Sequence, residues 1–104
     1  MRYEILLAPE AADDFRCLKA NLRAQVLEAI ECHLRNAPTR TSKSRIKRLR
    51  GLSRPQYRLR VGDDVRVFYD VTENAVEVLA IIPKSEANQW LERYGETDEE
   101  SSPD

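Results

Sequence analysis

Residues 57–82 decide the fold, and they read YRLRVGDDVRVFYDVTENAVEVLAII. Three runs in this stretch, 57–61, 65–71 and 76–82, are rich in β-branched and aromatic residues, which is typical of strands. The separators Gly62-Asp63-Asp64 and Thr72-Glu73-Asn74 are short and turn-forming. Short turns join antiparallel neighbours, so the stretch predicts two consecutive hairpins.

The length of the first turn determines which side chains share a face. Pairing of Val61 with Val65 across three residues places Arg60 opposite Arg66, whereas a turn of two or four residues would direct Arg66 inward. The alternating apolar side chains from Tyr57 to Tyr69 then form the core face. The opposite, exposed face is expected to carry an aromatic ring and three guanidinium groups: those of Phe68, Arg58, Arg60 and Arg66.

The flanking segments predict one strand and three helices. Residues 3–7 alternate as a short first strand, and Pro9 suits the first position of a helix with acidic residues in its first turn. Helical spacing continues to Asn36, which favours two antiparallel helices that break near Asn21, a possible N-cap. One helix of about 27 residues is the alternative. Residues 84–94 predict a closing helix, with Trp90 as a core anchor.

Together these segments predict an α+β fold, a small two-layer domain of order β-α-α-β-β-β-α. An N-terminal helical hairpin and a C-terminal helix would pack on an antiparallel sheet. Residues 1–95 are expected to form this single domain. Residues 96–104 hold five acidic side chains and no basic or apolar one, so they are expected to be a disordered acidic tail.

Several classes of protein do not fit the chain. No run of eighteen apolar residues exists among the 104, so no transmembrane helix is expected, and the N-terminus does not resemble a signal peptide. Cys17, Cys32 and the single histidine, His33, match no metal spacing. We expect both cysteines to be small core or boundary residues and His33 to be structural. A cytoplasmic protein without metal or cofactor is the simplest interpretation.

Charge is sorted strongly along the chain, although the formal net charge is only −1. No acidic residue lies between Cys32 and Gly62, and ten of the seventeen basic residues do: Arg35, Arg40, Lys43, Arg45, Lys47, Arg48, Arg50, Arg54, Arg58 and Arg60. Such a field attracts polyanions, so RNA, DNA or an acidic protein segment are the favoured partners. Residues 37–55 form a basic connector that Ile46, Leu49 and Leu52 are expected to fix to the core.

An ordinary alternative exists for the arginines of the sheet. Arg58 and Arg60 could form a solvated face, paired with the carboxylates of Asp63, Asp64 or Glu77. Like charges placed opposite each other in a sheet repel, however, and arginine suits phosphate through its planar fork of donors. Together with the basic connector, this favours a polyanion site.

The motifs IKRLRG (46–51), YRLR (57–60), VRVFYDV (65–71) and VEVLAIIPKSEA (76–87) occur in this order. By the order and spacing of these motifs, the chain resembles the RelE/ParE superfamily of toxins from bacterial type II toxin–antitoxin pairs. The resemblance covers residues 1 to about 94 and implies the fold described above. RNA-cleaving members of the superfamily cut mRNA in the ribosomal A site, whereas ParE-like members inhibit DNA gyrase. A cognate antitoxin silences both kinds, so the resemblance implies such a partner.

The resemblance also implies a site. Arg58, Arg60 and Arg66 match its catalytic basic residues, and Tyr69 matches a tyrosine of the same motif. Around them, the RNA-binding residues would be Arg45, Lys47, Arg48, Arg50, Arg54, Lys84 and Ser85.

Two positions depart from the RNA-cleaving pattern. Ser85 and Leu91 stand where those members have an arginine and a tyrosine or histidine, and Lys84, Trp90 and Tyr94 are nearby substitutes. The departure matters because metal-free RNA cleavage needs a base for the 2′ proton, positive charge on the phosphorus centre and an acid for the leaving oxygen. Arginine supplies charge but cannot serve as a base, whereas a lysine can.

The leading hypothesis is a RelE-like mRNA interferase, a metal-independent endoribonuclease that inhibits translation on the ribosome. The first alternative is a ParE-like inhibitor of DNA gyrase that does not cleave nucleic acid. The second is a catalytically inactive member that only binds its antitoxin.

Overall fold

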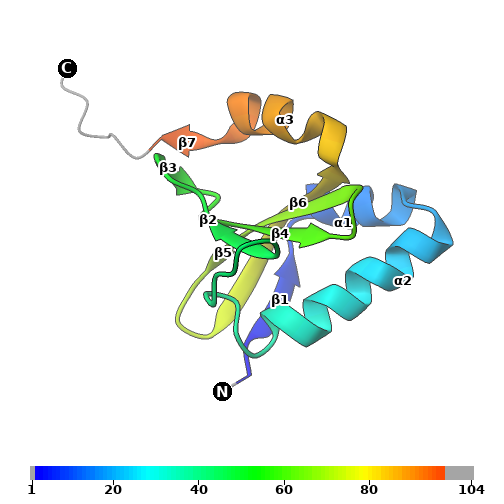
Figure 1. Ribbon diagram of the computed structural model, residues 1–104, viewed down its shortest axis with the longest axis horizontal. Helices are drawn as coiled ribbons and strands as arrows, with labels where there is room; N and C mark the ends of the chain where they lie inside the picture. Colours follow the sequence, from blue (N-terminus) through cyan, green and yellow to red (C-terminus); the bar gives the residue numbers. More distant parts are fainter. Residues whose placement is uncertain (1, 98–104) are drawn as a thin grey trace.

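A computed structural model describes residues 2–97 of the chain. Its helices and strands follow in the order β1 (Glu4–Leu7), α1 (Pro9–Cys17), α2 (Ala20–Ala29), a π-helical turn (Ile30–Leu34), β2 (Ile46–Arg48), β3 (Leu52–Arg54), β4 (Tyr57–Val61), β5 (Val65–Val71), β6 (Ala75–Pro83), a 3-10 turn (Lys84–Glu86), α3 (Ala87–Tyr94) and β7 (Glu96–Thr97) (Figure 1). The α+β class is confirmed. No helix of the described residues is both long enough and apolar enough to cross a membrane.

Five strands form the main sheet, in the order β1-β6-β5-β4-β2. The β4–β5 register is the predicted one, with Val61 opposite Val65 and Arg60 opposite Arg66. The expectation of a purely antiparallel sheet is wrong at one edge, because β1 pairs with β6 in parallel. Alternation in a short strand determines which face is buried but not the direction in which a distant edge strand pairs.

The N-terminal helices break earlier than expected. Leu18 and Lys19 adopt extended backbone, with ψ of 153° and 154°, and Lys19 is the N-cap of α2. Asn21, the predicted cap, lies inside the helix instead. Leu18 is partly buried and packs against the core at this break.

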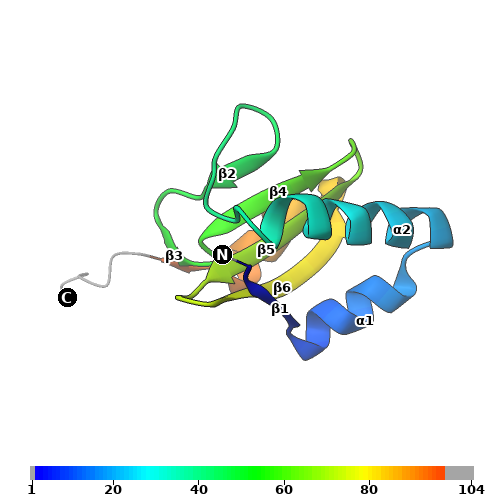
Figure 2. The same ribbon diagram turned by 90° about the horizontal axis from the view of Figure 1, so that it is seen from below.

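The main core lies between these helices and one face of the sheet (Figure 2). Val26 of α2, Leu59 of β4 and Tyr69 of β5 are fully buried in it. The Tyr69 hydroxyl donates a hydrogen bond to the Pro38 carbonyl (2.7 Å) and so ties the start of the basic connector to the sheet. Ile46 is also buried, as expected for a residue that fixes this connector to the core.

Helix α3 covers part of the opposite face of the sheet (Figure 1). Its Trp90 stacks on Phe68, with ring centroids 5.2 Å apart and planes 4° apart, and Phe68 is only 1% exposed. Trp90 is thus a packing anchor, as expected, but the prediction that Phe68 is exposed was wrong. The α3 helix adds a partial third layer to the two formed by the N-terminal helices and the sheet.

The basic connector contains two strands that sequence reasoning missed. β2 extends the main sheet beside β4, and β3 pairs with β7 in a separate two-stranded sheet. Glu96 and Thr97, expected to begin the tail, form β7 instead. The remainder of the expected tail, residues 98–104, lies outside the described residues.

Cys17 and Cys32 were expected to be small core or boundary residues, but both are exposed. Cys17 is the last residue of α1, and Cys32 lies in the π-helical turn. Among residues 2–97, no three histidine, cysteine or acidic side chains gather as metal ligands would.

Candidate anion-binding site

Strands β4 and β5 place Arg58, Arg60 and Arg66 on the same face of the sheet. Arg60 lies directly opposite Arg66, and Arg58 lies opposite Phe68, as the register predicted. Gly62 makes this register possible, because its φ of +59° lies in the left-handed region that favours glycine. We call Arg58, Arg60 and Arg66 the arginine cluster.

Strand β2 brings a fourth cation beside the arginine cluster. Lys47 is the register partner of Arg58, so the two side chains leave the same face of the sheet on neighbouring strands. Lys47 is exposed. Its predicted role in RNA binding is therefore geometrically possible, and the edge strand that places it there was not foreseen.

Arg58 carries the least satisfied group of the cluster. Its Nε atom is buried and has no hydrogen-bond partner among residues 2–97. Burial lowers the pKa of its guanidinium, and the positive charges of Arg66 and Arg60 lower it further. A buried donor without an acceptor is costly, so this position favours an external anion.

The Arg60 guanidinium is already paired with a carboxylate of the chain. The alternative in which Arg58 and Arg60 form a solvated face paired with nearby acids predicted this in part. Its Nη2 lies 2.5 Å from the Asp63 Oδ1 atom, and its Nε donates to the Gly62 carbonyl (3.0 Å). The hydrogen bond from Arg60 lowers the pKa of the Asp63 carboxyl. Asp63 itself is exposed, so an incoming phosphate can compete with it for Arg60.

Arg66 is less accessible than predicted, since only 7% of it is exposed. Its Nη1 donates to the backbone carbonyls of Val65 (3.0 Å) and Asp63 (3.4 Å). Burial, followed by the charge of Arg60, lowers the pKa of its guanidinium. The expectation of three fully exposed arginines was therefore wrong, because the face is partly enclosed.

Two of the predicted RNA-binding arginines make internal contacts. Arg54 lies between Asp70 (3.5 Å) and Glu77 (3.6 Å), and Asp70 is buried. Arg48 stacks over the Tyr57 ring at 5.4 Å and donates to the Gln56 carbonyl (2.8 Å). Both side chains hold the connector against the sheet. Arg50 is exposed in the turn before β3.

The turn after β6 lies at the same end of the sheet as the arginine cluster. The Lys84 backbone N–H donates to the Asp64 carbonyl (2.7 Å), and the Lys84 charge contributes to the lowered pKa of Asp63. Lys84 and Ser85 are both exposed. Leu91 instead packs against the cluster around Phe68, so it serves as a packing residue.

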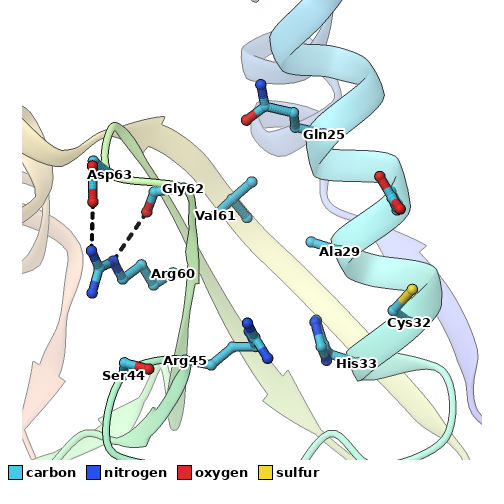
Figure 3. A pocket seen from close by; sticks show the side chains of 11 residues that line it. Gln25, Ala29, Cys32, His33, Ser44, Arg45, Arg60, Val61, Gly62 and Asp63 are labelled. Carbon is cyan, nitrogen blue, oxygen red and sulfur yellow. Dashed lines mark hydrogen bonds and ion pairs between the residues drawn. The ribbon is translucent and has the colours of Figure 1, made fainter.

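A groove lies between the helices and the end of β4, and Arg60 of the arginine cluster is one of its lining residues (Figure 3). Its volume is about 490 Å³, and its walls are the C-terminal part of α2, the π-helical turn, the connector and the end of β4. Arg45 and His33 point toward each other across it. Burial, followed by the charge of Arg45, lowers the pKa of the His33 imidazole.

The groove is the feature that sequence reasoning missed. Arg45, which was predicted to bind RNA together with the strand arginines, lines this groove, as does Arg60. His33 was interpreted as structural because it stands alone in a helical pattern. No spacing in the sequence connects residue 33 to residue 45, since their proximity depends on the path of the connector.

The arginine cluster can hold and neutralise a phosphate group, because three guanidinium groups converge there without an equal number of acids. None of the three can take up a proton. Among the described residues near the 62–64 turn, Lys84 is an amine-bearing side chain, the kind of cation that enzymes also use in proton transfer.

One family model matches most of the chain. A family model described as the ParE toxin of a type II toxin–antitoxin system, parDE, matches residues 5–88. No curated protein sequence matches the chain.

Solved structures share the fold at low identity. The RelB–RelE antitoxin–toxin complex from Methanococcus jannaschii matches with a TM-score of 0.63 and 20% identity, over 82% of this chain and 96% of that one. The DinJ–YafQ toxin–antitoxin complex from E. coli matches with 0.63 and 13%, over 82% and 96%. The YoeB dimer from Staphylococcus aureus matches with 0.61 and 18%, over 79% and 97%.

Proposed function

Because the chain belongs to the ParE toxin family of type II toxin–antitoxin systems, within the RelE/ParE superfamily, we propose that it inhibits translation by binding and cleaving mRNA on the ribosome. The observation that carries this proposal is the buried Arg58 Nε without a partner, held beside two further guanidinium groups. A phosphodiester supplies the missing acceptor. Lys47, on the neighbouring strand, extends the same positive surface along an RNA backbone.

In the proposed reaction, the 2′-oxygen of the RNA attacks the adjacent phosphorus and the bond to the 5′-oxygen breaks. The arginine cluster neutralises the charge that grows on the phosphorus centre, for which removal of a single preorganised donor typically costs about 2.7–4 kcal/mol. A base takes the 2′ proton, and water supplies a proton to the leaving 5′-oxygen. Lys84, exposed in the turn after β6 and bonded through its backbone to Asp64, is the candidate base.

Inhibition of DNA gyrase is the second candidate function. Two observations favour it: the matching family model is that of ParE, and Leu91 is a packing residue where RNA-cleaving relatives would have a tyrosine or histidine. A non-catalytic inhibitor needs no base. In that case the arginine cluster would bind acidic or phosphate groups of the gyrase–DNA complex.

The proposed partner in the resting cell is a cognate antitoxin. The RelE and YafQ structures that match are complexes with RelB and DinJ, respectively. We expect an antitoxin segment with acidic and apolar side chains to cover the arginine cluster. Such a complex should weaken with salt yet survive 1 M NaCl, since salt screens surface charge far more than apolar contact. A partner bound only to the Glu31 side of the N-terminal helices would contradict this.

Two assays run side by side test the proposed function. Purified protein is added to translating ribosomes with a defined mRNA, and separately to gyrase with relaxed plasmid. We expect new 5′-hydroxyl ends on the translated mRNA and unchanged supercoiling. The Arg66→Ala variant should lose cleavage while its circular dichroism stays native. Intact mRNA together with blocked supercoiling would replace this proposal with the gyrase alternative.

A further inference from the structure

The groove between α2 and the end of β4 carries the positive charge of Arg45. The Arg45 side chain is exposed and has no salt bridge with any of the described residues. The acidic side chain opposite, Asp63, is paired with Arg60. Glu28 is the remaining acid of the wall, and none of the salt bridges found among the described residues joins it to Arg45. The groove therefore suits an anion.

The volume of the groove and its other polar groups suit a ligand larger than a free anion. A volume of about 490 Å³ falls within the roughly 300–1,000 Å³ typical of small-ligand sites. Gln25 and Glu28 line the same wall as His33, one helical turn or more away. A carboxylate accepts hydrogen bonds from exocyclic amino groups, and an amide can donate to and accept from a base edge.

The groove also adjoins the arginine cluster through one residue. Arg60 lines the groove, while its guanidinium points away toward Asp63 (Figure 3). The register pairing of β2 with β4 ends at Leu59 of β4. Beyond it, the Arg60 N–H donates a hydrogen bond to the Arg45 carbonyl (2.8 Å). An extended polyanion that crosses this edge of β4 meets the arginine cluster on one side and Arg45 on the other.

We propose that the groove is a nucleotide subsite for the RNA strand, in which Arg45 and His33 hold a phosphodiester and Gln25 and Glu28 read an amino-bearing base. This inference rests on the proposed function and adds a source of sequence preference to it. Adenine and cytosine present an exocyclic amino group that Glu28 can bind, whereas uracil presents none. The subsite lies beside the cleavage site and takes no part in the proton transfers.

His33 makes the subsite measurable, because it is the only histidine of the chain and gives a single imidazole NMR signal. The charged and titratable groups that line the groove with it are Cys32 and Glu28 from the helix, Arg45 from the connector, and Arg60 and Asp63 from the β4 end. A bound phosphodiester adds a negative charge opposite Arg45. It should therefore raise the pKa of His33 toward its ordinary value.

The experiment titrates the full-length protein with three probes whose charge is constant near neutral pH: dimethyl phosphate, the dinucleotide ApA and the dinucleotide UpU. ApA should shift the His33 signal and raise its pKa at lower concentration than UpU, by roughly threefold or more for one base-edge contact. Arg45→Gln should remove the response. Arg40→Gln removes the same charge from an exposed position outside the groove and should keep it. Glu28→Gln should reduce the preference for ApA over UpU.

Three results would overturn the inference. The first is a His33 signal that no dinucleotide moves, and the second is a response that survives Arg45→Gln. The third is a response to an acidic peptide but not to ApA, which would assign the groove to a protein partner. An equal response to all three probes would refute the base-reading part. None of these outcomes depends on RNA cleavage. A His33 signal that does not respond to the probes, together with intact cleavage, rejects the subsite alone. A His33 signal that responds, together with absent cleavage, rejects the proposed function alone.

Discussion

Arg60 shows how the chain tolerates a cluster of like charges. Two guanidinium groups face each other at Arg60 and Arg66, an arrangement that repels unless an anion intervenes. Asp63 supplies that anion from the adjoining turn, 2.5 Å from Arg60. The carboxylate occupies one of the positions that a phosphate would take, so it competes with the proposed substrate.

This competition predicts the effect of a single substitution. Asp63→Asn should tighten RNA binding roughly three- to fivefold at low salt, because Arg60 becomes free and one repulsive charge is lost. Asp64→Asn is the matched control, since it removes the same charge from the next residue, for which no bond to Arg60 is found among the described residues. Fluorescence anisotropy with a short RNA measures both. Equal gains for the two variants would show that only net charge matters.

Asp70 provides a pH test of the contacts that hold the connector. Burial raises the pKa of this carboxyl, although the Gln56 N–H (2.7 Å) and Arg54 oppose the shift. A raised pKa means that the folded state binds the proton more tightly than the unfolded state. The stability that Asp70 contributes is therefore greatest below its ordinary pKa of 3.8 and declines as pH rises through the raised value.

Asp70→Asn should remove this decline, since the amide oxygen can still accept from Gln56. We expect the free energy of unfolding of the wild type, relative to the variant, to fall as pH rises from about 3.5. Urea unfolding at several pH values measures the difference, with Glu73→Gln in an exposed turn as the charge control. A relative stability that increases with pH over this range would contradict the raised pKa.

At the level of elements, the connector is where the fold and the site meet. Its strand β2 places Lys47 beside Arg58, and its strand β3 pairs with β7 beyond α3. Gly95 joins α3 to β7, and its backbone lies close to Leu91 and Leu52. A Cβ atom at this position would lie 2.6 Å from the Leu91 carbonyl oxygen and 3.4 Å from the Leu52 side chain. Only a residue without a side chain fits this link.

Gly95→Ala should therefore detach β7 from β3 without unfolding the main sheet. We expect a loss of about 1–3 kcal/mol, the usual scale for an added methyl group in a tightly packed place. Amide hydrogen exchange should accelerate in β3 and β7 and stay unchanged in β5. Asn88→Ala, on the exposed surface of α3, serves as the control. Unchanged exchange in β3 would mean that the link tolerates the methyl group.

The predictable elements were those specified by local pattern. Alternation and a three-residue turn gave the β4–β5 register, and with it the shared face of the arginine cluster. The edge strands β2, β3 and β7 have two or three residues each, too few for alternation to be visible. The parallel pairing of β1 and the groove at His33 depend on contacts distant in sequence, which no local pattern encodes.

The burial of Arg66 was missed for a related reason. Its face was expected to be open, because alternation identifies two faces of a sheet but does not show that α3 covers the second one. Trp90 was correctly interpreted as an anchor, yet its partner, Phe68, had been assigned to the exposed face. Connecting the two would have shown that the arginine cluster sits at the edge of a small second core.

Over the whole molecule, charge is separated by region. Residues 33–61 hold ten basic side chains and no acid, and the rest of the chain holds eighteen acids against seven bases. Strand β7 brings the start of the acidic C-terminal sequence next to the connector, with Glu96 opposite Arg54. The acids that follow in sequence, at 98, 99, 100 and 104, add negative charge to the chain beyond this point.

We predict that a chain ending at Thr97 binds RNA more tightly at low salt than the full chain. The gain should be roughly two- to fivefold near 50 mM salt and should fade as salt rises, because screening removes competition between like charges. A full-length variant with these four acids changed to amides should behave like the truncated chain. Identical affinities at every salt concentration would leave the acidic segment without a role in RNA binding.

The most direct test of the arginine cluster is growth arrest in cells that lack the antitoxin. Wild-type protein is induced beside two variants: Arg58, Arg60 and Arg66 changed together to glutamine, and the exposed Arg2, Arg40 and Lys43 changed in the same way. We predict that the wild type and the second variant stop translation and growth before any change in DNA supercoiling. The first variant should accumulate as a folded protein and permit growth. Full growth arrest by that variant would contradict the assignment of function to the arginine cluster.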